Sequence, residues 1–451
     1  MMRTRFITPV RKVFIGFLLA ALLTLAAWPA APIAAAGENA PAGGAQLAGL
    51  LSADGSLRLE AGVSGMLDLH GWDVTIDAQR GPLFHPAGSQ SPARALAGGT
   101  WSALGTGVGG FVSVIAVSGS SVYAGGSFSS AGTCTSGCMN IAKWDGSAWS
   151  ALGSGMNNWV VTIAISGNDV YAGGAFTSAG TCTSGCNRIA KWDGSTWSAL
   201  GTGMNTFVYA LAVSGNDVYA GGSFSSAGTC TGGMGCNRIA KWNGSTWSAL
   251  GTGIIGDEIY SIAASPSAVY AAGYFTQAGA CNSNCKNIAE WDGGGWSGLG
   301  GGTNTGITFV AVNGGAVYAS GSFTSAGTCL SGCVSIARWD GSAWSGVGGG
   351  TNGNVQSLAF IGSDLYITGS FTSAGTCTSG CKFVAKWDGG SWSGLGEEIG
   401  GPGLTVVANG RALYAGGFFS SAGTCTSGCN HIAKYTLPFT PHWVYLPLVM
   451  R

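Results

Sequence analysis

The chain repeats itself with a period of about 48 residues, and this repeat limits its possible folds more than any other feature. The period is marked by cysteine pairs, whose first members lie 48 residues apart except for one step of 51. A chain of 451 residues would ordinarily be divided into two or three domains, but a repeat of this length indicates one structural unit copied along the chain. The seven pairs are Cys134/Cys138, Cys182/Cys186, Cys230/Cys236, Cys281/Cys285, Cys329/Cys333, Cys377/Cys381 and Cys425/Cys429.

Each repeat contains four short strand-like runs separated by turns. In the second repeat the sequence predicts strands over residues 160–165, 170–176, 189–192 and 197–200. Asp193-Gly194 predicts a hairpin between the last two, because glycine accepts a positive φ. Four short strands in this length are typical of a β-propeller blade, whereas a β-solenoid usually has shorter coils that do not pair two hairpins.

The strands are out of phase with the repeats, and this predicts how the ring closes. The first three strands occur seven times, but Trp101 precedes the first full set and the last set stops at Tyr435. We therefore expect an all-β, seven-bladed propeller over residues 99–436, in which the strand near Trp101 completes the last blade and removes an open edge. The fourth-strand tryptophans are Trp101, Trp149, Trp197, Trp247, Trp296, Trp344 and Trp392.

The repeat resembles the kelch-type propeller repeat over roughly residues 100 to 435. The resemblance rests on the fourth-strand tryptophan and on a glycine doublet after the second strand. Three repeats depart from the doublet with Ala272-Gly273, Ser320-Gly321 and Thr368-Gly369, and the Trp-Asp-Gly and CxxxC elements are not part of the usual kelch pattern. Kelch folds host binding proteins and a copper oxidase, so the resemblance implies a fold and no single function. The doublets are Gly125-Gly126, Gly173-Gly174, Gly221-Gly222 and Gly416-Gly417.

The segments that flank the ring are short. Residues 1–36 predict a cleaved signal peptide, because a basic start is followed by an apolar run and by the small residues Ala34-Ala35-Ala36; an uncleaved anchor is the alternative. No other stretch is long and apolar enough to span a bilayer. We expect residues 37–98 to be an extension or linker with short strands. Residues 437–451 are a tail or a final strand packed against the propeller.

The cysteine pairs are predicted to be local disulfides. A zinc site needs four ligands, and the chain has only His70, His85, His431 and His442 to complete seven half-sites. Secretion would place the pairs where disulfides persist. Each bond would stiffen a Gly/Ser/Thr-rich loop.

The Trp-Asp-Gly motif is predicted to be structural. Its acids recur as Asp145, Asp193, Asp292, Asp340 and Asp388, with Asn243 as a variant, whereas a catalytic site needs one unlike set of residues. The motif resembles the Asp-box of sialidases, but its spacing differs by one residue. A sialidase also needs clustered arginines, and those of the ring are Arg188, Arg238, Arg338 and Arg411 in equivalent or scattered places. A copper oxidase would need several histidines at the funnel, and the ring has only His431.

The candidate binding surface is the face that carries the cysteine loops. In a propeller, loops between the second and third strands emerge on the same face as the blade-to-blade connections, so both should form one rim. Five acids break the repeat and are candidates for binding a cation or a basic partner there, although drift on a solvated loop explains them too. They are Asp257, Glu258, Glu290, Glu397 and Glu398.

Composition limits the function classes. Only 8% of residues are charged and the formal net charge is zero, so nucleic acid and anionic membranes are not expected partners. We expect a secreted or cell-surface monomer that is no enzyme, needs no cofactor and holds a protein or glycan on its loop rim. The alternative is an extracellular carbohydrate-active enzyme with its site in the funnel. Convergence of the residues that differ between blades would separate the two.

Overall fold

The computed structural model describes residues 99–438, together with Leu51 and the segments 65–68, 72–77, 81–86 and 443–446. The predicted signal peptide, residues 1–36, lies outside the described residues. The chain forms two compact units, Pro92–Phe439 and Met1–Ser91 with Thr440–Arg451. No helix in the described part is long and apolar enough to cross a membrane.

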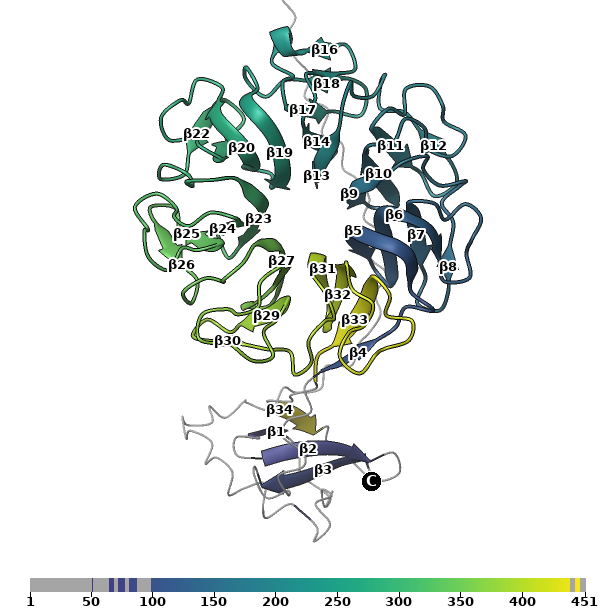
Figure 1. Cartoon of the computed structure of the whole chain (residues 1–451), viewed down its shortest axis with the longest axis vertical. Coiled ribbons are helices and arrows are strands. Elements are labelled where there is room, and N and C mark those ends of the chain that lie inside the picture. The colour runs from purple at the N-terminus through teal and green to yellow at the C-terminus, as the bar shows by residue number, and fades with distance from the viewer. Residues whose placement is uncertain are drawn as a thin grey trace, which may run out of the picture. The chain divides into compact units, whose positions relative to one another are not determined.

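The larger unit is a ring of seven four-stranded antiparallel sheets, which confirms the predicted propeller (Figure 1). The first strand of each blade lies innermost and the fourth outermost. The first strands are β5 (Val108–Ser118), β9 (Val160–Ser166), β13 (Val208–Ser214), β19 (Ile254–Ala264), β23 (Ile307–Asn313), β27 (Val355–Ile361) and β31 (Gly403–Asn409). The second strands are β6 (Ser121–Ala131), β10 (Asp169–Gly174), β14 (Asp217–Gly222), β20 (Val269–Ala278), β24 (Ala316–Gly321), β28 (Asp364–Gly369) and β32 (Ala412–Gly417).

The outer half of each blade is shorter. The third strands are β7 (Ile141–Trp144), β11 (Ile189–Trp192), β17 (Ile239–Trp242), β21 (Ile288–Trp291), β25 (Ile336–Trp339), β29 (Val384–Trp387) and β33 (Ile432–Thr436). The fourth strands are β8 (Trp149–Ser150), β12 (Trp197–Ser198), β18 (Trp247–Ser248), β22 (Trp296–Gly298), β26 (Trp344–Gly346), β30 (Trp392–Ser393) and β4 (Thr100–Ser102). The longer cysteine loop of the third blade adds β15 (Ser226–Ala227), β16 (Cys230–Thr231) and the 3-10 turn η2 (Gly232–Met234). In the second blade the second strand ends at Gly174 and the fourth at Ser198, both two residues earlier than expected.

The ring closes as predicted, with the N-terminal strand β4 completing the last blade. Trp101 lies across from Tyr435, and their rings are 5.0 Å apart. The closure differs from the other blades in one respect. The Tyr435 hydroxyl donates to the Leu395 carbonyl at 2.6 Å, while the Trp101 indole donates to the Glu397 backbone carbonyl at 3.2 Å. Elsewhere the fourth-strand tryptophan itself reaches the equivalent carbonyl, as Trp197 does to Leu152 at 2.9 Å.

The hydrophobic core lies between neighbouring blades. Ile141 of the first blade, for example, packs with Val160 and Phe176 of the second. The first residue of the glycine doublet belongs to this interface, because a Cβ on Gly173 would lie 2.7 Å from Val208 of the next blade. The second residue is glycine in all seven blades, since a Cβ there would meet a carbonyl of its own blade's first strand segment, at 2.1 Å for Gly174. The two glycines of the kelch-like doublet therefore meet two separate packing requirements, one between blades and one within the blade.

The smaller unit contains two pairs of strands. The segment β1 (Gly65–Asp68) pairs antiparallel with β34 (Trp443–Leu446), and β2 (Trp72–Asp77) pairs with β3 (Gly81–Pro86), which includes His85. Part of the expected C-terminal tail is thus a strand paired with the N-terminal extension. His70 and His442 lie outside the described residues.

Candidate ligand-binding face

The cysteine loops and the blade-to-blade connections form one face, as expected, and we call it the rim face. Between the first two blades, Met156 of the connection donates its N–H to Met139 of the preceding cysteine loop at 3.0 Å. Gly180 of the following cysteine loop donates to Gly155 of the same connection at 2.7 Å. The first strands begin at this face and surround the centre of the ring (Figure 1), so their first residues lie at the mouth of the central opening.

Each first strand carries a β-bulge close to this mouth. In the second blade Val160 pairs with Gly174 and Thr162 with Gly173, which leaves Val161 as the extra residue. Bulges redirect side chains and are common beside binding and active sites. The seven extra residues are Ser113, Val161, Tyr209, Tyr260, Thr308, Gln356 and Leu404.

Differences between blades gather at the mouth. The residue before each bulged segment is Phe111, Trp159, Phe207, Glu258, Gly306, Asn354 and Pro402 in chain order. The residue after the second glycine is Ser127, Ala175, Ser223, Tyr274, Ser322, Ser370 and Phe418. These positions vary while the glycines, tryptophans and cysteines of the same blades repeat, because the scaffold contacts do not constrain them.

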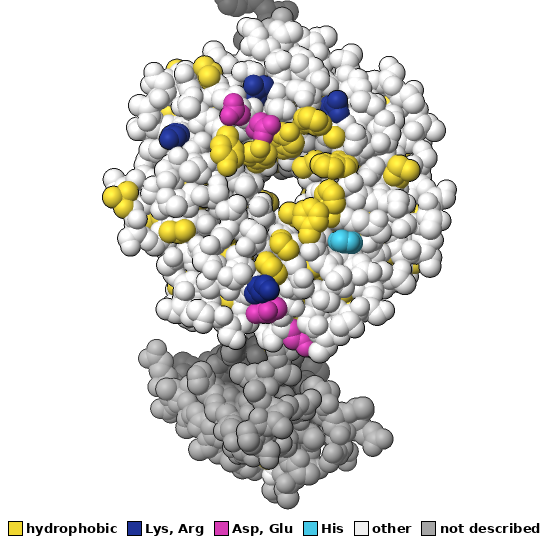
Figure 2. All heavy atoms as spheres, in the orientation of Figure 1, with side chains coloured by type: hydrophobic (Ala, Val, Ile, Leu, Met, Phe, Trp, Pro, Cys, Tyr) yellow, Lys and Arg dark blue, Asp and Glu magenta, His cyan; other side chains and the backbone are white. Residues whose placement is uncertain are grey.

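One set of aromatic side chains joins the last blade to the first two, and we call it the Trp159 group. The Phe111 ring lies 4.7 Å from that of Phe418 and 5.4 Å from that of Trp159. Trp159 is 49% exposed and Phe418 is 50% exposed. Figure 2 shows hydrophobic side chains gathered around the central opening. Exposed rings of this size gathered at one place are typical of binding surfaces.

A second set, the Tyr260 group, continues around the mouth on the third and fourth blades. Phe207 stacks near Tyr209 at 5.9 Å, Tyr209 lies 5.3 Å from Tyr260, and Tyr260 meets Tyr274 edge to face at 5.8 Å and 82°. Phe207 is 37% and Tyr274 is 39% exposed. The Tyr274 hydroxyl lies 3.4 Å from Ser322 on the fifth blade. The two groups together place rings on five of the seven blades.

Glu258 lies inside the Tyr260 group. Its carboxylate accepts hydrogen bonds from the hydroxyl of Tyr260 and, at 3.4 Å, from that of Tyr209. Burial and the bond to Glu258 raise the pKa of Tyr260, and burial followed by the charge of Glu258 raises that of Tyr209. Both phenols therefore remain protonated donors across the physiological range, and they orient the carboxylate.

One further position combines unusual backbone geometry with side chains that vary between blades. This is the position directly before the third strand of each blade. All non-glycine residues with positive φ in the described part of the chain occupy it. The Arg188 backbone is typical, donating to Phe176 at 2.8 Å and accepting from Gly174 at 2.9 Å. The Arg188 guanidinium lies 5.0 Å from the centre of the Phe207 ring, a cation–π contact within the Tyr260 group. The seven residues are Asn140, Arg188, Arg238, Asn287, Ser335, Phe383 and His431.

The structure separates the five acids that the sequence singled out. Asp257 is exposed and Glu258 half-buried, and both lie in β19 at the mouth. Glu397 accepts the Thr424 N–H at 3.1 Å and Glu398 accepts the Gly380 N–H at 3.1 Å. These two carboxylates therefore fasten neighbouring cysteine loops to the connection before the last blade.

Glu290 does not join the other acids at the rim. It lies in β21 across from Tyr270, the second residue of β20, towards the hairpin that joins β19 and β20. That hairpin is at the end of the blade opposite the cysteine loop. In the second blade the same position is Lys191, which pairs with Asp169 at 2.6 Å. The expectation that Glu290 contributes to a rim site is wrong, because the register of β21 places it elsewhere.

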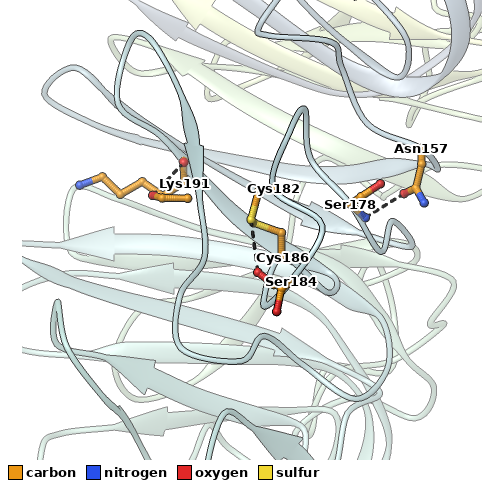
Figure 3. Close-up of a disulfide and its surroundings, with 7 residues drawn as sticks. Asn157, Ser178, Cys182, Ser184, Cys186 and Lys191 are labelled. Atoms are coloured by element: carbon orange, nitrogen blue, oxygen red, sulfur yellow. Dashed lines mark hydrogen bonds between the residues drawn. A yellow bond between two sulfur atoms is a disulfide. The ribbon is translucent and has the colours of Figure 1, made fainter.

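The cysteine loops are internally fixed. All seven pairs form disulfides within their own loops, and the described residues contain no free cysteine. Figure 3 shows the pair Cys182–Cys186. Asn157 of the connection accepts the N–H of Thr177 at 2.9 Å and of Ser178 at 3.1 Å (Figure 3). The Gly-Met-Asn connections therefore use their asparagine to hold the neighbouring loop.

The two cysteines of each disulfide lie in different surroundings. The first cysteine is partly exposed in six of the seven loops, whereas the second is fully buried in all seven. Cys186, for example, packs in the core with Met156 and Phe176, because a bonded sulfur is apolar and is favoured inside. Each disulfide therefore anchors its loop to the core between blades, and its second sulfur is not available to a ligand on the rim. The buried residues are Cys138, Cys186, Cys236, Cys285, Cys333, Cys381 and Cys429.

The Trp-Asp-Gly acids are turn residues, as predicted. Asp145 accepts the N–H of Ala148 at 2.8 Å and of Ser147 at 2.7 Å, and these bonds lower its pKa to about 2. Asn243 accepts the equivalent N–H groups at 2.9 Å without a charge. The acid therefore serves as a hydrogen-bond acceptor.

Metal-ligating residues do not converge within residues 99–438 or the other described segments, where no group of three or more His, Cys, Asp and Glu could hold a metal ion. The His431 ring lies against the backbone of its own blade, with Nδ1 3.0 Å from the Gly417 carbonyl oxygen. The sequence-based search for acids found Asp257 and Glu258 but missed the rings beside them. Aligning the repeats column by column would have found them, because the aromatic residues occupy columns that vary.

Comparison with known proteins gives the fold alone. No protein-family model matches the chain, and no curated protein matches it in sequence. Among solved structures, YCF48 bound to D1 peptide is similar at 13% identity over 76% of this chain and 97% of that one, with a TM-score of 0.48. The WD40 β-propeller domain of Doa1 is similar at 13% identity over 75% and 97%, with a TM-score of 0.47.

An enzyme is also among the similar structures. The GH74 xyloglucanase from Xanthomonas campestris has 13% identity over 72% of this chain and a TM-score of 0.45, and this chain spans about half of it, 53%. Such identities and TM-scores are too low to support any inference about function. The chain is a seven-bladed, all-β propeller on the evidence of its own sheets.

Proposed function

We propose that this protein is a secreted or cell-surface binding propeller that holds its ligand, a protein or a glycan, against the mouth of the rim face. The observation that carries the proposal is the pair of aromatic groups, whose exposed members project where the scaffold does not require them. Covering the exposed half of Trp159 alone would remove on the order of 100 Å² from water, which contributes about 2–3 kcal/mol.

Three further features support a binding role. The rim loops are held by disulfides and by asparagine side chains, so little conformational entropy would be lost on binding. The first strands carry bulges close to the mouth, and the bulged residues Tyr209 and Tyr260 belong to the Tyr260 group. Most residues that differ between blades at the mouth are aromatic or small and not titratable, which favours binding over catalysis. Kelch-like membership and an extracellular location are part of this proposal, the latter supported by the seven disulfides.

The test compares matched variants in a binding screen. The purified chain is applied to a glycan array and to a peptide array, and every hit is measured again with the double variant Trp159→Ala/Phe418→Ala. Leu330→Ala is the control, because Leu330 is 78% exposed but belongs to a cysteine loop. We expect the double variant to lose at least tenfold in affinity. Equal binding by all three proteins would overturn the proposal.

A further inference from the structure

The mouth contains one corner that differs from the rest. At the position where three blades have Phe111, Trp159 and Phe207, the fourth blade has Glu258. The same blade is the only one of the seven with aromatic residues both at the bulge, Tyr260, and after the second glycine, Tyr274. A carboxylate and two rings that are not required by the repeat therefore meet in one blade.

The faces of the rings around this carboxylate are electron-rich, so they attract cations as the carboxylate does. Tyr260 and Tyr274 stand nearly perpendicular, and Tyr209 lies beside Tyr260. The face of an aromatic ring attracts cations through its quadrupole, and a nearby carboxylate adds to this attraction. The chain itself provides an example in the same group, since Arg188 lies over the Phe207 ring.

Within residues 99–438 the charge of Glu258 has no ion-pair partner. In this part of the chain its carboxylate accepts hydrogen bonds from two neutral phenols, those of Tyr209 and Tyr260. Arg238, on the neighbouring third blade, instead donates to the carbonyls of Gly256 at 3.1 Å and of Ser223. The three ion pairs in the described ring join lysines and aspartates elsewhere in the blades.

We propose that Glu258, with Tyr209, Tyr260 and Tyr274, receives the lysine or arginine side chain of an extended protein segment, whose apolar neighbours lie on the Trp159 group. This inference rests on the proposed function and names its ligand class. A protein segment fits better than a glycan because Glu258 attracts a cation, which lysine and arginine supply and neutral sugars do not. An anionic glycan would also be repelled by Glu258 and Asp257.

The test uses peptides selected from a random 12-residue phage library on the immobilised full chain. We expect enriched peptides to carry Lys or Arg beside apolar residues. The affinity of one such peptide, and of its copy with norleucine in place of lysine, is then measured on wild type, Glu258→Gln and Glu290→Gln. Glu290→Gln is the matched control because it removes the same charge away from the mouth.

The expected result is a loss of about tenfold on Glu258→Gln for the lysine peptide and less than twofold for the norleucine peptide. The control should change neither. Should Glu258→Gln fail to fold, Tyr274→Leu replaces it, because Tyr274 is exposed and its loss should spare the core.

The two proposals fail in different ways. Suppose that Trp159→Ala/Phe418→Ala abolishes binding but Glu258→Gln leaves the ratio of the affinities for the lysine and norleucine peptides unchanged. The proposed site for a basic side chain at Glu258 is then refuted, and the proposed binding face remains. Selection of peptides without basic residues, or binding only to neutral oligosaccharides such as cellohexaose, also refutes the site at Glu258. If neither variant changes the affinity of any selected peptide, the proposed function fails as well.

Discussion

The residue before the third strand shows how one backbone position serves different purposes. Its left-handed conformation is unfavourable for most side chains and well tolerated by asparagine. In the first and fourth blades asparagine also adds hydrogen bonds. Asn287, for example, donates to the Thr303 carbonyl at 3.0 Å and accepts the Phe275 N–H at 3.2 Å. Arg188, Phe383 and His431 have no side-chain amide for this pair of bonds, although they share the backbone conformation.

We predict that Ser335→Asn stabilises the protein by about 1 kcal/mol, because the new side chain would reach the Thr351 carbonyl and the Phe323 N–H. The measurement is the free energy of unfolding in denaturant. Asn287→Ser in the equivalent position should lower it by a similar amount. Equal stability of wild type and Ser335→Asn would show that asparagine does not form these stabilising hydrogen bonds in the fifth blade.

At the level of the strands, each interface between blades contains one closely packed residue pair. Most blades place a small residue on the second strand against a branched residue on the next blade's first strand, as Gly173 does against Val208. Between the sixth and seventh blades the sizes are exchanged. Thr368 stands where glycine is expected, and Gly403 stands where Val or Ile is expected. The departure from the kelch-like doublet is thus compensated across the interface.

This exchange of sizes predicts that a second substitution can restore the stability lost in the first. A Cβ on Gly403 would lie 1.8 Å from the Thr368 hydroxyl, so Gly403→Val should destabilise the fold by about 1–3 kcal/mol through overpacking. The double variant Thr368→Gly/Gly403→Val should recover most of that loss, because it recreates the Gly173–Val208 pair. A double-mutant cycle on unfolding free energies measures the coupling. Additive effects of the two changes would contradict the interpretation.

At the scale of the whole molecule, the ring depends on two chain segments that are distant in sequence. The strand containing Trp101 pairs with β33, and its absence would leave an open edge on the last blade. The hydrogen bond from Tyr435 to Leu395, found only at this seam, strengthens the same interface. Closure therefore adds long-range order to a structure built from local hairpins.

The closing strand gives a prediction with an internal control. Trp101→Ala and Trp197→Ala remove equivalent side chains and should each cost about 3–5 kcal/mol. Only Trp101→Ala loosens the closing strand, so it alone should associate, through the exposed edge of β33, in light scattering coupled to gel filtration. Monomeric behaviour of both variants would show that β4 is held without its tryptophan.

The blade number, the strand order and the closure could all be predicted from the repeat, because its turns, tryptophans and cysteines are local signals. The sequence also identified the disulfides and the structural role of the Trp-Asp-Gly acids. The repeat does not show which sulfur of each disulfide is buried, because neighbouring blades supply the core around it.

The proposed binding face could not be predicted from the repeat either. Residues as distant in the chain as Phe111 and Phe418 become neighbours through closure, and a bulge turns Tyr209 and Tyr260 towards Glu258. The structure likewise removed Glu290 from the candidate site, since strand register, and not residue type, determines to which end of a blade a side chain belongs.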